Sequence, residues 1–150
     1  MKKEAEFRKQ LGALFGDQRL ATLSTQQDGQ PYASLVAFVA GKDFRHIYFA
    51  TPNTTRKYAN LKAENRVALL INSSVNQVSD FNLAVSVTAV GRAIELGDGE
   101  KDAVRIQYLA KHPYLADFVE SPTCAFIDVT VATYYMVRNF QNVTTLHMLP

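Results

Sequence analysis

The chain has 150 residues, of which 47% are hydrophobic and 20% charged, and its formal net charge is +2. These values predict one ordinary globular domain over residues 1–150, and its scattered cations argue against a nucleic-acid-binding protein. No apolar run approaches the roughly 20 residues that cross a bilayer, and the charged N-terminus does not resemble a signal peptide. A lone Cys124 excludes an intrachain disulfide and a cysteine metal cluster, so we expect a cytoplasmic protein.

The first predicted element is an amphipathic helix over residues 4–15. Its apolar side chains recur at the i, i+4, i+7 and i+8 positions of one helical face, and charged residues occupy the other face. These apolar residues are Phe7, Leu11, Leu14 and Phe15. Gly16 and Asp17 then end the helix.

Apolar and β-branched runs separated by turn residues predict a mainly β chain. The clearest hairpin signal is Asp28-Gly29, which separates two such runs. Gly91 is expected to mark a bulge or bend in a later strand, whose buried face would carry Leu83, Val85 and Val87. The predicted strands cover residues 19–25, 31–40, 46–51, 66–72, 82–96, 124–131 and 133–139.

Two further helices are predicted, over 58–65 and 100–111, and a short helical turn is expected near Phe118. The second helix should face the core with Val104 and Tyr108. Meandering strands with tight turns and few helices favour an antiparallel barrel with peripheral helices over a doubly wound fold.

The segment from Thr51 to Lys57 carries the clearest chemical signal. Thr54 or Thr55 is the expected N-cap of the helix that follows. Arg56 and Lys57 fall in the first turn, where the helix macrodipole normally favours carboxylates. Two cations, two hydroxyl groups and free backbone N–H groups together make a socket for a phosphate. The alternative interpretation is a pair of solvated surface cations.

No side-chain acid, base or nucleophile stands in a recognisable catalytic arrangement. His46, His112 and His147 lie far apart and have no ligand partner nearby in the sequence, so no metal site is predicted. The segment 97–99 reads as a turn rather than a dinucleotide fingerprint. Cys124 precedes an apolar strand and is expected to be a buried thiol. The sequence identifies no catalytic residue, so an enzyme of this kind would rely on a cofactor.

Six segments in order resemble the pyridoxamine 5′-phosphate oxidase-like, FMN-binding split β-barrel superfamily. They include Asp28-Gly29-Gln30-Pro31 and Thr55-Arg56-Lys57, and the full set is 20–25, 28–31, 47–51, 55–61, 65–71 and 90–93. The resemblance spans roughly residues 20–96, about half of the chain. The resemblance implies an antiparallel split β-barrel that forms a homodimer, with one FMN in each of two clefts between the subunits.

The resemblance also implies which residues contact FMN. The strand after the Asp-Gly turn would run along the flavin ring, the next strand end would lie near the ring and ribityl chain, and the helix start would hold the phosphate. In that order the residues are Ser34, Leu35 and Val36; Phe49, Ala50 and Thr51; and Thr55, Arg56 and Lys57.

Two departures separate the chain from true pyridoxamine phosphate oxidases. Ser34 and Val39 stand where that enzyme has Arg and Lys, and residues 138–141 lack its Arg-x-His motif. We therefore expect an FMN-dependent oxidoreductase acting on another small molecule. The alternatives are a non-catalytic or sensory FMN-binding protein and a relative that binds haem or the deazaflavin F420. Residues 134–136 are expected either at the dimer interface or in the core.

Overall fold

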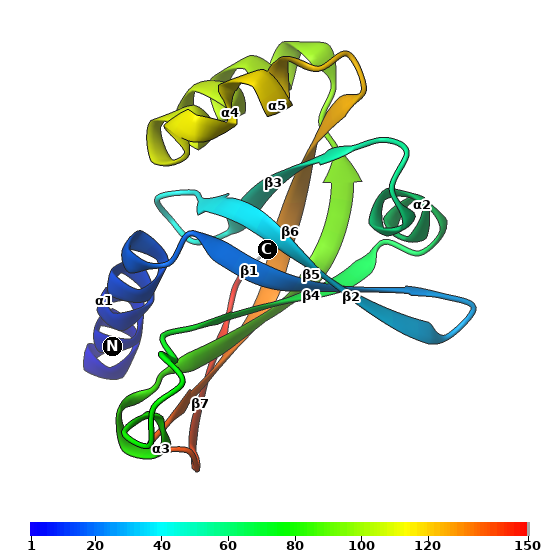
Figure 1. Cartoon of the computed structure of the whole chain (residues 1–150). Coiled ribbons are helices and arrows are strands. Elements are labelled where there is room, and N and C mark those ends of the chain that lie inside the picture. Colours follow the sequence, from blue (N-terminus) through cyan, green and yellow to red (C-terminus); the bar gives the residue numbers. More distant parts are fainter. Residues whose placement is uncertain (150) are drawn as a thin grey trace.

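The computed structural model describes residues 1–149, which form an antiparallel β-barrel surrounded by helices (Figure 1). The strands are β1 (Leu20–Gln27), β2 (Gln30–Ala40), β3 (His46–Pro52), β4 (Arg66–Asn72), β5 (Ser86–Glu95), β6 (Cys124–Arg138) and β7 (Asn142–His147). Their order is β3-β2-β1-β4-β5-β6-β7, and an additional β3–β6 pairing closes β1 to β6 into a barrel. The predicted mainly β split barrel is therefore confirmed.

Strand β6 is longer than the sequence predicts. We expected two strands over 124–131 and 133–139, but the structure has one continuous strand. One edge of β6 pairs with β5, while the other pairs first with β3 and then with β7. The register between β5 and β6 shifts at Val90/Gly91, so the predicted irregularity at Gly91 is confirmed. Strand β7 was not predicted; it follows a turn in which Asn139 and Phe140 have positive φ.

The helices are α1 (Lys2–Asp17), α2 (Arg56–Ala63), α3 (Asp80–Leu83), α4 (Asp98–Lys111) and α5 (Ala116–Glu120), with a 3-10 turn, η1 (Pro113–Leu115), before α5. Helix α3 corrects the prediction of a strand over 82–96, since β5 begins only at Ser86 and Leu83 is 74% exposed. The Asp80 carboxylate accepts the backbone N–H groups of Val75 and Gln77, which favours a local turn over an extended strand.

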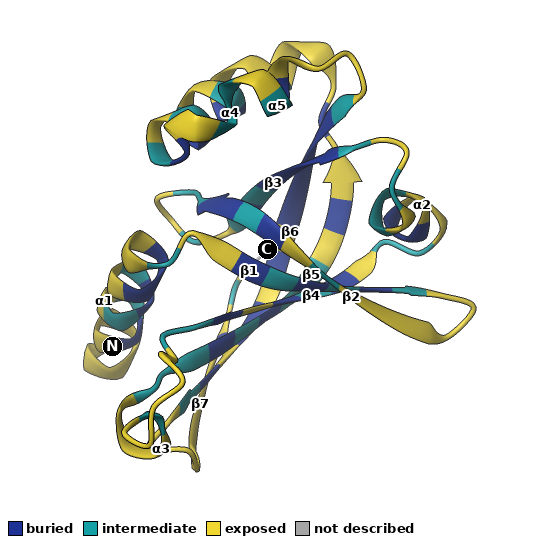
Figure 2. Cartoon of the chain, in the orientation of Figure 1, coloured by how far each residue is buried: buried dark blue, intermediate teal, exposed yellow. Residues whose placement is uncertain are grey.

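Two apolar cores lie on opposite sides of the barrel wall. Figure 2 shows buried residues along the strands of the barrel and on parts of α1 and α4. The larger core fills the barrel and continues under α1. The smaller core packs α4 and α5 against the outer faces of β2, β3 and β6, through residues that include Val39, Ala50, Tyr108 and Phe126. Tyr134 and Met136 are fully buried, so they belong to the core and not to an interface, while Tyr135 is 40% exposed.

Candidate functional site

The end of β3 and the start of α2 are joined by two hydroxyl side chains. Thr51 is fully buried, and its hydroxyl oxygen lies 2.9 Å from that of Thr55. Thr55 is the N-cap, because its side chain accepts the backbone N–H of Tyr58 at 3.3 Å. Helix α2 therefore begins at Arg56, two residues earlier than predicted. The N–H groups of a helix's first residues have no carbonyl in a preceding turn. The Tyr58 N–H is bonded to the cap, which leaves those of Arg56 and Lys57 for a ligand.

The first turn of α2 is positively charged and contains no acidic residue. Arg56 is exposed, and its guanidinium carbon lies 5.8 Å from the centroid of the Tyr32 ring. Lys57 is half-buried, and this burial lowers the pKa of its ammonium group. Within residues 1–149, neither cation has a carboxylate within 4.0 Å. Their charge is thus not neutralised by the described part of the chain.

A cavity of about 260 Å³ opens beside Lys57. Its other walls are almost entirely apolar and come from five elements of the chain. They are Leu35, Val36 and Ala37 of β2, Ala50 and Pro52 of β3, Tyr108 of α4, Leu115 of η1 and Phe118 of α5. The cavity is therefore apolar along its length and cationic at the end where α2 begins.

The edge of β2 beside this cavity is left open by the strand pairing. β2 pairs with β1 along Gln30–Ala37 but with β3 only along Phe38–Ala40. Residues 31–37 consequently have no strand on their second edge, and Leu35 is 63% exposed there. An unpaired strand edge presents backbone donors and acceptors to a ligand. One acceptor is taken, because the Tyr108 hydroxyl donates to the Ala37 carbonyl at 3.0 Å.

The structure brings together some of the nine residues implied by the resemblance and separates others. Leu35, Val36, Ala50 and Lys57 line the cavity. Arg56 and Thr55 stand at the start of α2 beside it.

The other three implied residues do not line the cavity. Phe49 is fully buried inside the barrel, and Thr51 holds Thr55 as described above. Ser34 is half-buried, with a buried hydroxyl oxygen that has no hydrogen-bond partner among the described residues.

Sequence reasoning missed the contribution of the last third of the chain to this cavity. Tyr108 is 1% exposed, and burial raises the pKa of its phenol well above the ordinary value. Helical spacing correctly predicted that Tyr108 faces a core. The spacing could not show that this core lies against the outer wall of β2 and β3.

The other residues considered for catalysis or metal binding are held by contacts within the fold. His112 is buried with Nε2 2.7 Å from the Phe38 carbonyl, and His46 Nδ1 lies 2.8 Å from Asp128 Oδ1. Burial raises the pKa of the Cys124 thiol, which disfavours the reactive thiolate. Among residues 1–149, no three His, Cys, Asp or Glu side chains are grouped so as to hold a metal ion. Over the same residues, every helix is too short or too polar to cross a membrane.

Comparison with known proteins identifies the family. The family model described as pyridoxamine 5′-phosphate oxidase matches residues 7–138, so the chain belongs to this family. The resemblance seen in the sequence is thereby confirmed. A search of curated proteins finds no match.

Solved structures share the fold at low sequence identity. Campylobacter jejuni ChuZ is 14% identical with a TM-score of 0.80, over 95% of this chain and 60% of that one. A heme-binding protein from Mycobacterium smegmatis is 17% identical with a TM-score of 0.79, over 95% and 57%. A FAD-binding protein from Mesorhizobium loti is 20% identical with a TM-score of 0.69, over 85% and 90%. The chain thus spans less than two thirds of the first two proteins.

Proposed function

We propose that this protein binds FMN in the cavity beside Lys57 and is an oxidoreductase that uses FMN to act on a small molecule. The observation that carries the proposal is the un-neutralised cationic start of α2 at one end of an apolar cavity. FMN has matching chemistry, because it joins a flat aromatic ring system to a phosphate. A pair of solvated surface cations accounts less well for Lys57, whose half-burial lowers its pKa without a compensating carboxylate.

The residues present would divide the binding between them. Lys57, Arg56 and the first N–H groups of α2 would hold the phosphate through charge-assisted hydrogen bonds. Leu35 and Ala50 would contact the ring with their side chains, whereas Val36, whose side chain belongs to the barrel core, would face it only through its backbone. The open edge of β2 would supply backbone hydrogen bonds to the polar rim of the ring. When bound, FMN supplies hydride and electron transfer, and the protein contributes orientation and electrostatics.

A second subunit would complete this cavity. Its volume, about 260 Å³, is below the roughly 300–1,000 Å³ of typical ligand pockets. Leu35 at its rim is mostly exposed, although an apolar contact to a ring system would require it to be covered. We therefore keep the homodimer with the cofactor between subunits as part of the proposal. Sedimentation showing only monomers that still bind FMN tightly would contradict it.

Two measurements test the function. The purified protein reconstituted with FMN should show a flavin absorption spectrum, and it should then consume NAD(P)H when a suitable acceptor is present. A Soret band, together with failure to bind FMN, would instead support the haem-binding alternative. A flavin spectrum without turnover over a broad panel of donors and acceptors would support the sensory alternative.

A further inference from the structure

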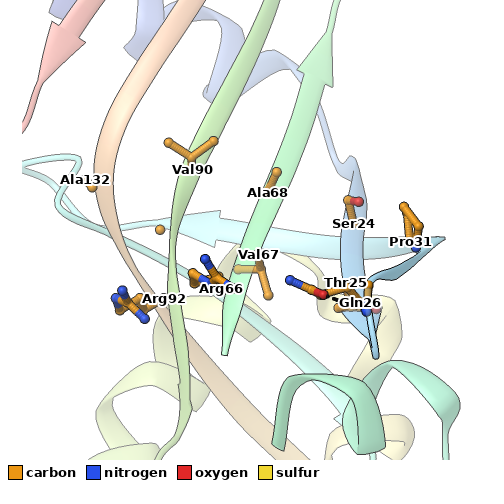
Figure 3. A pocket seen from close by; sticks show the side chains of 12 residues that line it. Ser24, Thr25, Gln26, Pro31, Arg66, Val67, Ala68, Val90, Arg92 and Ala132 are labelled. Atoms are coloured by element: carbon orange, nitrogen blue, oxygen red, sulfur yellow. Dashed lines mark hydrogen bonds between the residues drawn. The ribbon is translucent and has the colours of Figure 1, made fainter. Parts of the chain in front are cut away.

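Two arginines face each other across neighbouring strands on the outer wall of the barrel. The register places Arg66 of β4 directly opposite Arg92 of β5. Figure 3 shows both at the same end of these strands, away from Ala68 and Val90. Like charges at directly opposed positions destabilise a sheet. Both side chains are exposed, so core packing does not explain why arginines occupy these two positions.

The neighbouring carboxylate, Glu64, forms an ion pair with only one of the two arginines, although the charge of Arg92 also acts on it. Glu64 Oε1 lies 2.6 Å from Arg66 Nε, and this contact holds the pKa of Glu64 below its usual range. Arg92 Nη1 donates to the neutral side-chain oxygen of Asn65 at 3.1 Å. Within residues 1–149, no carboxylate lies within 4.0 Å of Arg92. Two arginines and one glutamate leave a net charge of +1, centred on Arg92.

Both arginines line a cavity of about 530 Å³, and no aspartate or glutamate does (Figure 3). Its floor is formed by small or apolar residues of β4, β5 and β6: Val67, Ala68, Val90, Gly91 and Ala132. The β1–β2 hairpin closes the far side with Ser24, Thr25, Gln26, Gly29 and Pro31. No residue of this cavity also lines the cavity beside Lys57.

The bulge at Gly91 fixes the position of Arg92. A Cβ atom at Gly91 would lie 2.1 Å from the Thr130 carbonyl oxygen, so only glycine fits at this close approach. The bulge leaves Ala132 without a partner on β5, and Ala132 forms part of the cavity floor. Bulges bend a strand and re-aim its side chains, and they are frequent beside functional sites.

We infer that this cavity is a second binding site, for a small organic carboxylate whose apolar part rests on Ala68 and Val90. The planar guanidinium of Arg92 would take the carboxylate with two parallel hydrogen bonds. A single negative charge balances the net +1 of the Arg66, Glu64 and Arg92 group. The predominantly apolar floor then accommodates a ring or short chain. This site is independent of the proposed FMN site.

The test is titration of the full-length protein with benzoate by isothermal calorimetry. Benzamide serves as the neutral probe of the same shape, and inorganic phosphate as the competing anion. Saturable benzoate binding is expected, and benzamide should not bind. Arg92→Gln leaves one neutral N–H donor in place of two charged ones, so it should weaken benzoate by at least about 10- to 100-fold, the value of one charge-assisted hydrogen bond. Arg19→Gln is the matched control, because this exposed arginine lines a different cavity, and it should leave the affinity unchanged.

Thermal unfolding supplies a second readout that separates binding from a structural role. Without ligand, Arg92→Gln should keep or raise the melting temperature, because it removes one of two opposed cations. Saturating benzoate should raise the melting temperature of the wild type but not of the variant. Benzoate affinity that survives Arg92→Gln, equal binding of benzamide, or tighter binding of phosphate than of benzoate would each overturn the assignment.

Discussion

Replacing Arg56 and Lys57 by alanine should separate the affinity for FMN from the affinity for riboflavin. Only FMN carries the phosphate that these two cations would bind. One hydrogen bond to a charged group is worth about 1.5–3 kcal/mol, which corresponds to about 10- to 100-fold in the dissociation constant. Losing both should weaken FMN by about two to four decades if the effects add, while riboflavin affinity changes little.

The two cations should contribute unequally. Lys57 is half-buried and its pKa is lowered, so its charged ammonium group is stabilised most by an ion pair with the phosphate. Arg56 is exposed and already lies over the Tyr32 ring, so water screens its interaction with the phosphate. We expect Lys57→Ala to approach the 100-fold end of the range and Arg56→Ala to stay near tenfold.

The fold should tolerate this double substitution. Removing two cations from the positive end of α2 relieves about 0.3–1 kcal/mol each. Losing the cation–π contact between Arg56 and Tyr32 costs about 0.5–1 kcal/mol. The summed gain is about as large as the loss or larger, so the melting temperature should not fall and a loss of FMN binding would not reflect unfolding.

Flavin fluorescence quenching measures both affinities on the same protein. Lys62→Ala is the matched control, because Lys62 lies in the last turn of the same helix. It should leave FMN and riboflavin affinities unchanged. An equal loss of both ligands in the double variant, or no loss of FMN, would refute a phosphate site at the start of α2.

Three further outcomes are expected. Burial lowers the pKa of Lys111 to about 8 from 10.5, so between these pH values only the unfolded chain keeps the proton; across this window the free energy of unfolding of the wild type should rise with pH relative to that of Lys111→Met in urea titrations, and parallel pH dependences of the two proteins would contradict this. Gly91→Ala should lower the free energy of unfolding by about 1–3 kcal/mol or more, because its methyl group meets the Thr130 carbonyl; an unchanged denaturation midpoint would contradict the close approach. Pyridoxamine 5′-phosphate should not be turned over, because Val39 is buried under α4 and provides no cation; efficient hydrogen peroxide release would contradict this.

Local signals in the sequence were sufficient to predict the helix start at which the proposed phosphate site lies. A hydroxyl N-cap followed by two cations is a pattern of neighbouring residues, so the sequence predicted the cap as Thr54 or Thr55, and the structure shows that it is Thr55. Most of the strands were predicted for the same reason, because apolar runs and turn residues are also local signals. Strand β7 and helix α3 were missed because a positive-φ turn and a carboxylate-bonded loop leave weak patterns in apolar periodicity.

The alternation of side chains along a strand explains which implied residues fail to line the cavity. Phe49 and Ala50 are neighbours on β3, so they point to opposite faces, and only Ala50 is on the outer wall. The same rule places Ser34 and Leu35 on opposite faces of β2. A ligand on one side of the wall cannot contact both members of such a pair through their side chains. The alternation of side chains along each strand could be seen in the sequence. Which face of the strand points outward was determined by the closure of the barrel.

The two ends of the proposed FMN site have different structural origins, and this difference separates cofactor binding from substrate choice. The cationic end depends on β3 and α2, which lie within the sequence segments that resemble the superfamily. The opposite wall depends on Tyr108, Leu115 and Phe118, which lie in the tail beyond those segments. Changes in the tail would therefore reshape the space beside the flavin ring without touching the phosphate contacts. On this proposal, variants at Leu115 and Phe118 should alter which small molecule reacts, while the ratio of FMN affinity to riboflavin affinity, which the phosphate contacts set, stays near that of the wild type.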